Sequence, residues 1–593
     1  MSGTLALASA IAAMDQETLT SLVLQRRPQA AAGVSDPIGL ASELLRSDAV
    51  SRALAPLDTT RLATLLSLSG DVDLEPDPNL IAELTRLGLV GLDNGNSTPL
   101  PEITLAVQSG LNAAGVSPSE LTATAAAENP DDAGPDTSTW YAAAVTSVGQ
   151  SAEILRQLVD RPGRLNRNGS IAVATIRLLA ESSSVEVTEA TLALRALERA
   201  ELVSTSKASQ LLLSTAATTQ WLAKSYGERW IDLANATMSA MPAPLLGTLG
   251  IAGTDLASAV AALPVQFPLL PPAELTAAAE FIKATEHLGL TVEGMLSAPA
   301  RALLAGDHEA ARGALERDLP AVTSGIYVQP DLSIVVPGPL SPSDEAEVAA
   351  LSRPEHIGIA TTRRVTEASL ADAIERGATA DSTRGVFTRL SLTGIPQPLD
   401  YLLTSLAERV GTIVVADHVG EEGRTRVTVS RPELGQTIFV DRSLQHVQFS
   451  PSSSNATVLY SRLRPEHVIA ALNDARYPAS MANARAAFQV PQRADEVEKP
   501  TDASGLTPEL INLVERVFLA ARSEPGTGDF TRLLELAIRE RGTVRVTAEA
   551  RGQTHQFTLL PVSLSGGRLR ATDAAAGMER TLPVSTITAV ESV

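Results

Sequence analysis

Apolar positions recur at helical spacing through the first half of the chain, in short segments that begin at capping residues. Asp15, Asp36 and Asp58 each precede such a segment, and an aspartate at this position accepts a hydrogen bond from the first turn of a helix. The run from residue 77 to residue 90 has the pattern of a helix that leads into a strand. We therefore predict a helical domain with a winged helix at residues 1–125.

The range 126–149 begins with a segment rich in Pro, Gly and acidic residues that shows no helical or strand periodicity. This composition predicts a linker. In residues 150–232, apolar residues mark two helices, and two short apolar runs around a Ser/Thr/Lys turn follow. This order is typical of a winged helix-turn-helix domain. The positions are Ile171, Val173, Ile176 and Leu179 in the first helix, Leu192, Leu194 and Leu197 in the second, and Leu202-Val203 and Leu211 to Leu213 in the hairpin.

The second half of the chain changes period. Residues 233–320 still read as helices with a further winged helix, but residues 321–490 alternate strands, among them Thr437 to Val440, with helices and predict an α+β domain. Residues 491–508, rich in Pro, Asp and Glu, predict a second linker. Residues 509–593 predict two helices and then strands, which favours a small β-barrel-like domain. The predicted fold class is multidomain α+β, with a helical and winged-helix N-terminal half.

The composition describes a globular protein, with 44% hydrophobic and 19% charged residues over 593 positions. The absence of cysteine excludes disulfides, thiolate metal sites and cysteine nucleophiles. No run reaches the ~18 uninterrupted apolar residues of a membrane span. The first basic residue is Arg26, so the start of the chain lacks the charged region of a secretory signal. We expect a cytoplasmic or nucleoid-associated protein with no membrane partner.

The lysines argue against a nucleotide-dependent enzyme, because a phosphate-binding loop needs glycine immediately before its lysine. The chain has four lysines, Lys207, Lys224, Lys283 and Lys499, and they follow Ser206, Ala223, Ile282 and Glu498. Zinc-protease, serine-hydrolase and dinucleotide-binding motifs are also absent from the sequence. The acidic group around His418 lies between glycines and predicts a solvated turn rather than a metal site. We expect no catalysis, no metal and no cofactor.

The net charge of −21 would repel a nucleic-acid backbone, so any contact with DNA must be local. Between residues 156 and 230 the balance reverses, with ten basic residues against seven acidic ones. Arg195 and Arg199 lie one turn apart on the predicted recognition helix. A solvated helix face neutralised by Glu198 and Glu201 explains the same pattern equally well. The candidate DNA-binding residues are Arg161, Arg164, Arg167, Arg195, Arg199 and Lys207.

Three stretches carry a family likeness: Tyr327 to Leu340, Ala368 to Gly377, and Gly394 to Leu399. They resemble the N-terminal domain of XPB-type DNA helicases, and more closely the bacterial, actinobacterial-type helicase-associated proteins that carry this domain without the motor. The order of winged helices before such a domain is also similar to that of the TFIIH subunit that clamps XPB. The resemblance implies an XPB-type helicase as a partner, with duplex or junction DNA as a second one.

The C-terminal segment from Leu533 to Ile587 resembles a WYL domain, a small barrel associated with nucleic-acid-responsive regulators in bacteria. It departs from the family at the residues that name it. Gly567, Arg568 and Leu569 stand in place of Trp-Tyr-Leu, and Thr586 stands where an arginine is expected near the last strand. The resemblance therefore concerns the fold rather than ligand binding.

The leading hypothesis is a non-catalytic accessory protein of an XPB-type helicase in DNA repair or processing, with weak DNA binding through winged helices. The alternative is a winged-helix/WYL-type transcriptional regulator, which would bind one short DNA site tightly. A third reading is a structural scaffold that binds no DNA. The predicted docking elements are the strand from Leu332 to Val336 and the helix from Ala368 to Ile374. The candidate partner-binding residues, chosen as rim charges, are Arg363, Arg364, Glu367 and Glu375.

Overall fold

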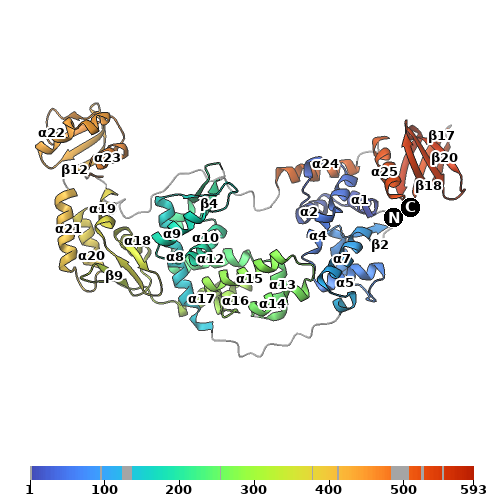
Figure 1. Ribbon diagram of the computed structural model, residues 1–593, viewed down its shortest axis with the longest axis horizontal. Helices are drawn as coiled ribbons and strands as arrows, with labels where there is room; N and C mark the ends of the chain where they lie inside the picture. The colour runs from blue at the N-terminus through green and yellow to red at the C-terminus, as the bar shows by residue number, and fades with distance from the viewer. Residues whose placement is uncertain are drawn as a thin grey trace.

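The computed structural model divides the described residues into five units, each with an apolar core of its own (Figure 1). Helical units and small sheets follow one another, which confirms the predicted multidomain α+β class. Within the described ranges, no helix is both long and apolar enough to cross a membrane. The structure describes residues 3–93, 96–122, 137–206, 208–253, 255–376, 378–410, 413–477, 479–481, 507–522, 527–550 and 553–592. We name the units the N-terminal unit (3–122 with 507–522), the central unit (137–319), the third unit (326–410), the fourth unit (413–481) and the C-terminal unit (527–592).

The N-terminal unit is a bundle of short helices whose starts carry the predicted caps. Asp15 and Asp58 accept hydrogen bonds from the backbone N–H groups of Thr18 and Arg61, at 2.7 and 2.8 Å. The elements are α1 (Gly3–Ala13), α2 (Gln16–Arg26), η1 (Ala31–Gly33), α3 (Pro37–Leu44), α4 (Ser47–Leu54), α5 (Thr59–Ser69), α6 (Pro78–Arg86), β1 (Val90–Asp93), β2 (Asn96–Pro99), α7 (Pro101–Ala114) and η2 (Pro118–Thr122).

Helix α24 (Pro508–Arg522) completes this core although it comes from the far end of the chain (Figure 1). Leu513 and Val517 are fully buried in it, and Arg516 Nη2 donates to the carbonyl of Ala31 at 2.8 Å. The structure therefore divides the range 509–593, which we predicted as one domain. Its first helix packs with the N-terminal unit, and the rest forms a unit of its own.

The central unit begins with a helix, a strand, two helices and a hairpin, and the first strand pairs with the last in a sheet of order β3-β5-β4. Further helices pack on the same core, so residues 150–232 and 233–320 share one interior instead of forming the two predicted domains. The elements are η3 (Thr137–Thr139), α8 (Trp140–Asp160), β3 (Gly163–Arg164), α9 (Val173–Ser182), α10 (Val187–Arg199), β4 (Val203–Ser206), β5 (Leu211–Ser214), α11 (Ala217–Leu222), α12 (Tyr226–Ser239), α13 (Ala243–Ala252), α14 (Leu256–Gln266), α15 (Pro272–His287), β6 (Thr291–Val292), β7 (Met295–Leu296), α16 (Ala298–Leu304) and α17 (His308–Asp318).

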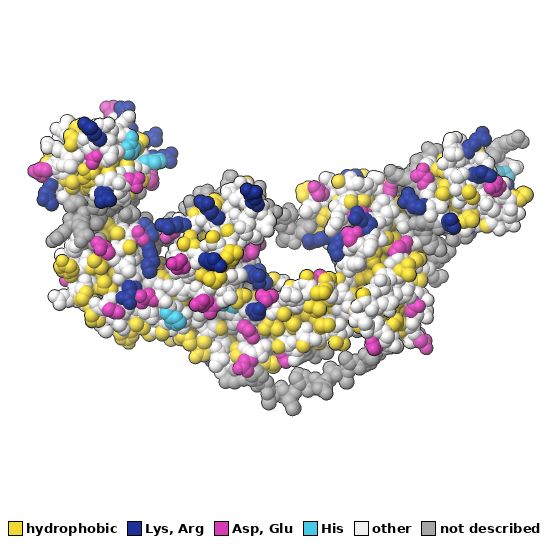
Figure 2. All heavy atoms as spheres, in the orientation of Figure 1, with side chains coloured by type: hydrophobic (Ala, Val, Ile, Leu, Met, Phe, Trp, Pro, Cys, Tyr) yellow, Lys and Arg dark blue, Asp and Glu magenta, His cyan; other side chains and the backbone are white. Residues whose placement is uncertain are grey.

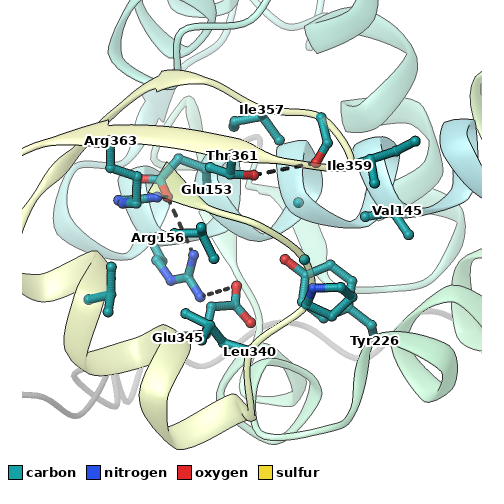
Figure 3. Close-up of a pocket in the computed structure, with 16 residues that line it drawn as sticks. Val145, Glu153, Arg156, Tyr226, Leu340, Glu345, Ile357, Ile359, Thr361 and Arg363 are labelled. Carbon is teal, nitrogen blue, oxygen red and sulfur yellow. Dashed lines mark hydrogen bonds and ion pairs between the residues drawn. The ribbon is translucent and has the colours of Figure 1, made fainter. Parts of the chain in front are cut away.

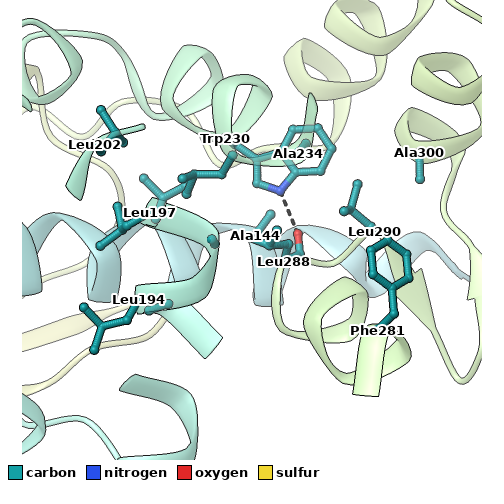
Figure 4. Packing of buried hydrophobic residues seen from close by; sticks show 14 of the residues in the cluster. Ala144, Leu194, Leu197, Leu202, Trp230, Ala234, Phe281, Leu288, Leu290 and Ala300 are labelled. Atoms are coloured by element: carbon teal, nitrogen blue, oxygen red, sulfur yellow. Dashed lines mark hydrogen bonds between the residues drawn. The ribbon is translucent and has the colours of Figure 1, made fainter. Parts of the chain in front are cut away.

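Two tryptophans pack against each other in the core of the central unit. The rings of Trp140 and Trp230 lie 5.2 Å apart, and both side chains are 1% exposed. Trp230 donates its indole N–H to the carbonyl of Leu288 at 2.7 Å, which satisfies the buried polar group (Figure 4). This hydrogen bond joins α12 to the end of α15.

The third unit is an antiparallel sheet of order β10-β11-β9-β8 with helices packed on it. Its elements are β8 (Tyr327–Val328), β9 (Ser333–Val336), α18 (Pro342–Leu351), β10 (Arg353–His356), β11 (Thr361–Arg364), α19 (Glu367–Glu375), α20 (Ala380–Leu390) and α21 (Gln397–Val410). The core of this unit is separate from the next one, so the predicted α+β domain at 321–490 contains two cores.

The fourth unit is a five-stranded sheet of order β14-β15-β13-β12-β16, in which only the pairing of β12 with β16 is parallel. The prediction of a strand from Thr437 to Val440 is wrong. Pro432 opens a helix there, and Ile438 is buried while Phe439 and Val440 are exposed. The elements are β12 (Ile413–Gly420), β13 (Gly423–Val429), α22 (Pro432–Val440), η4 (Arg442–Val447), β14 (Ser450–Pro451), β15 (Val458–Ser461), α23 (Pro465–Asp474) and β16 (Ser480–Met481).

The C-terminal unit packs one helix on a five-stranded antiparallel sheet of order β20-β19-β18-β17-β21. Its outer strands, β20 and β21, do not pair with each other in the described ranges, so the sheet is not the closed barrel that the predicted barrel-like domain suggests. The elements are α25 (Thr527–Glu540), β17 (Val544–Ala550), β18 (Gln553–Ser565), β19 (Arg568–Asp573), β20 (Glu579–Pro583), η6 (Val584–Thr586) and β21 (Ile587–Ser592).

Candidate functional site at the contact between two units

Three predicted DNA-binding residues lie close together in the sequence around β3. Arg161 follows α8, Arg164 ends β3, and Arg167 lies in the loop before α9. All three are exposed and make no ion pair within the described chain. Basic side chains are spaced over the visible face of the central unit and do not form one dense patch (Figure 2). These residues remain available to a phosphate backbone.

Arg195 and Arg199 lie beside helix α15, where Arg195 is exposed and Arg199 is partly exposed. The guanidinium of Arg199 lies 5.6 Å from the ring centre of Phe281, and Arg195 Nη1 lies 4.0 Å from Glu280 Oε2. Burial, with the nearby charge of Arg195, lowers the pKa of Arg199. Arg199 thus contacts a helix that we predicted in another domain, and DNA binding by Arg195 and Arg199 stays a prediction. Lys207 lies outside the described residues.

The predicted partner-binding residues are not four equivalent rim charges. Arg363 is 6% exposed, so its placement on a rim is wrong. Arg364 pairs with Glu355 across strands β11 and β10, where both side chains are more than a third exposed. Glu367 is exposed at the start of α19. Glu375 ends α19, and its side chain lies outside the described residues.

The predicted docking elements are also largely internal. Strand β9, at Ser333–Val336, lies between β11 and β8, so it offers no free edge to a partner. On α19, Leu370 and Ala373 are 1% and 0% exposed. The edge strands are β10 and β8. At β8, the hydroxyl of Thr393 already bonds the backbone N–H and carbonyl of Val328, at 3.2 and 3.1 Å.

Arg363 belongs to a buried ion cluster where the third unit meets the central unit (Figure 3). Its Nη1 lies 3.1 Å from Glu153 Oε2, and its Nε and Nη2 donate to the hydroxyl and carbonyl of Ser352 at 2.9 and 3.1 Å. Glu345 accepts from Arg156 at 2.8 Å and from Arg229 at 2.7 Å. We call the following set the interunit ion cluster: Glu153 and Arg156 of α8, Arg229 of α12, Glu345 of α18, and Arg363 of β11.

The charges of the interunit ion cluster compensate one another almost fully. Burial alone would raise the pKa of Glu153, but the charges of Arg363 and Arg156 outweigh it and lower that pKa. Burial and the two arginines that bind Glu345 have the same opposing effects, and its pKa is also lowered. Both carboxylates are therefore ionised at neutral pH, and three guanidinium groups face two carboxylates.

Tyr226 closes the cluster on the side of α12. The guanidinium of Arg229 lies 5.4 Å from the centre of its ring, and burial together with Glu345 raises the pKa of the phenol. Beside these residues is a cavity of about 40 Å³ (Figure 3). A space of this size can hold a few water molecules.

The central and third units are also closely packed at this contact. A Cβ on Gly149 would lie 2.9 Å from Ile357 Cγ2, so only glycine lets α8 approach the third unit this closely. Ser184 donates its hydroxyl to the carbonyl of Pro354 at 2.7 Å. In the described part of the chain, no three His, Cys, Asp or Glu side chains gather as metal ligands. The ion pairs, the hydrogen bond of Ser184 and the close packing together join the third unit to the central unit.

The match with a known protein family covers the third unit and part of the fourth unit. Residues 326–452 match a family model described as the helicase conserved C-terminal domain. The matched range contains the third unit and much of the fourth unit. A comparison with curated proteins found no match. The chain is helicase-related in this segment, which confirms the coarse prediction, while the description names neither XPB nor a WYL domain.

Proposed function

We propose that this protein is a non-catalytic accessory protein of an XPB-type DNA helicase and acts in DNA repair or processing. One observation carries the proposal: a helicase-related segment occurs in a chain in which none of the four lysines follows a glycine. A helicase motor needs a phosphate-binding loop whose lysine reaches the nucleotide. A helicase-related segment without that loop retains surfaces for association but has no means of driving strand separation.

The element order of the central unit supports DNA contact as the second part of the role. A helix, a strand, two helices and a hairpin, with the first strand paired to the last, is the order of a winged helix. Exposed Arg161, Arg164 and Arg167 beside β3 supply the positive charge in this proposal. Because α15 covers part of α10, we propose contact with the phosphates rather than insertion of α10 deep into a groove.

The association is tested by capturing the full chain from its native host and identifying a bound helicase. Arg364→Glu breaks an exposed Arg–Glu pair in the third unit and is expected to weaken helicase recovery. The matched control is Arg570→Glu, which breaks an exposed pair with Glu579 in the C-terminal unit. If no helicase is recovered with the wild-type chain, or if both variants lose it equally, the docking role fails.

The DNA contact is tested separately with fluorescent duplexes. Reversing Arg161, Arg164 and Arg167 to Glu is expected to lower duplex affinity strongly, since phosphate contacts dominate affinity and reversal adds repulsion. Binding of duplexes of different sequence should be weak and similar. Tight binding to one short site, without helicase association, would replace the proposal by the transcriptional regulator.

A further inference from the structure

Among the described residues, the helices of the fourth unit pack on one face of its sheet and leave the other face uncovered. Helices α22 and α23 pack on the covered face, where Val415, Val427 and Leu459 form the core. Along β13, burial alternates strictly, so Arg424 and Arg426 point away from that core. We call this side of the sheet the open face.

The open face is basic. Arg424 and Arg426 are exposed, and neither makes an ion pair or a side-chain hydrogen bond in the described part of the chain. Arg462 and Arg464 are exposed directly after β15, which lies beside β13. In the hairpin turn beside them, Glu422 Oε2 lies 3.2 Å from His418 Nε2. Arg424 and Arg426 therefore place two positive charges on one side of β13, where an anion can approach both.

Aromatic rings lie among these charges. Tyr460 stands directly opposite Arg426 in the antiparallel pairing of β13 with β15, so its side chain shares the open face. The imidazole of His418 reaches over from β12, with the two ring centres 4.8 Å apart and tilted by 40°. Tyr460 is only partly buried, so one side of this ring pair is accessible. Basic and His side chains show on the side of this unit that faces the central unit (Figure 2).

We propose that the open face binds single-stranded nucleic acid, with phosphates on Arg424 and Arg426 and a base stacked on Tyr460. Guanidinium groups bind phosphate in a bidentate manner, and aromatic rings on an open sheet stack bases of any sequence. A duplex keeps its bases stacked on one another, so it cannot use the ring. The overall charge of −21 makes such a local surface necessary for any nucleic acid contact. This proposal is independent of the winged helix and of the helicase partner.

The test measures fluorescence anisotropy of labelled 15-mers of deoxythymidine and of uridine, and of a duplex, with the full chain. Arg424→Gln with Arg426→Gln should weaken single-strand binding at least about tenfold and reduce the slope of log affinity against log salt by ~1.4, for two lost phosphate contacts. The matched control, Arg431→Gln with Arg442→Gln, removes the same charge next to α22 and η4, on the helix-covered side. It should leave affinity within about twofold of the wild type.

Substitutions of Tyr460 distinguish the contribution of base stacking from that of phosphate binding. Tyr460→Ala should weaken binding about fivefold or more without changing the salt slope, and Tyr460→Phe should retain wild-type affinity. Any of three results would overturn the proposal. The two double variants could lose affinity equally, the wild-type chain could fail to bind the single strands, or Tyr460→Phe could lose as much affinity as Tyr460→Ala. Saturable binding of an oligoglutamate peptide without any oligonucleotide binding would overturn it in favour of an acidic protein partner. Helicase capture by Arg424→Gln/Arg426→Gln should be unchanged, so the two proposals fail separately.

Discussion

Replacement of Arg363 by Met should uncouple the third unit from the central unit. The substitution keeps much of the side-chain volume but leaves Glu153 with Arg156 alone, at 3.4 Å, and removes the donors to the hydroxyl and carbonyl of Ser352. Removal of one partner from a buried ion pair costs ~3–5 kcal/mol. Because Arg156 still pairs with Glu153, we expect a loss at the lower end of this range, about 3 kcal/mol.

The chain supplies its own reporter for this experiment. Its three tryptophans, Trp140, Trp221 and Trp230, are all buried in the central unit, whereas Arg363 lies in the third unit. Urea unfolding followed by tryptophan fluorescence therefore reports on the central unit, although the substitution is in the third unit. With a slope of ~2 kcal/mol per M, a loss of 3 kcal/mol lowers the midpoint by about 1.5 M.

The neighbouring residue provides the matched control. Arg364→Met breaks an exposed pair on the same strand, which contributes ~0–1 kcal/mol, and should leave the tryptophan transition nearly unchanged. A double variant, Glu153→Leu with Arg363→Met, removes both charges and should recover much of the loss, since apolar replacement of a whole buried pair is often neutral. Equal midpoints for Arg363→Met and Arg364→Met would refute the reasoning.

Three further predictions follow from other parts of the molecule. The pKa of Glu153 and of Glu345 is lowered in the folded chain, so their contribution is fully present above the ordinary value of 4.5 and is lost as the pH falls through the lowered values. The urea midpoint should be constant from pH 7 to about pH 5 and fall below about pH 4; a midpoint that stays constant to pH 3 would contradict this. Gly289→Ala should destabilise the central unit far more than Gly306→Ala, although both have positive φ, because only the first added Cβ meets a carbonyl oxygen, that of Trp140 at 2.3 Å. Thermal melts that shift by the same amount would exclude this explanation. The accessory role also predicts that calorimetric titration of the purified chain with ATP gives no saturable binding, and micromolar affinity would remove the basis for that role.

Local signals in the sequence account for much of the secondary structure. Aspartate caps and prolines at first turns locate helix starts such as those at Asp15 and Asp58, and apolar runs separated by turns locate the hairpin of β4 and β5. The run from Thr437 to Val440 misleads because β-branched and aromatic residues favour strands, whereas Pro432 five residues earlier already fixes a helix.

The assembly of these elements is not encoded in local patterns. Helix α24 is visibly amphipathic, but nothing in its residues identifies the N-terminal core as its partner. The same limit applies to the site. Arg363 was chosen for its charge, but its partner Glu153 lies 210 positions away, and a side chain of this type reads as a surface charge until its ion pair is known. Likewise, the i,i+4 spacing of Arg195 and Arg199 gives no sign of Phe281.

The return of helix α24 to the N-terminal core has a consequence for synthesis of the chain. The last element before it in that unit, η2, ends at Thr122, so about 400 residues must be translated before the helix that packs against α2 exists. At ~5–20 residues per second, this delay is roughly 20–80 s. During that time the nascent N-terminal unit presents an uncovered apolar surface on the ribosome. The protein should therefore depend on chaperones that bind nascent chains, and its folding yield should fall when they are depleted.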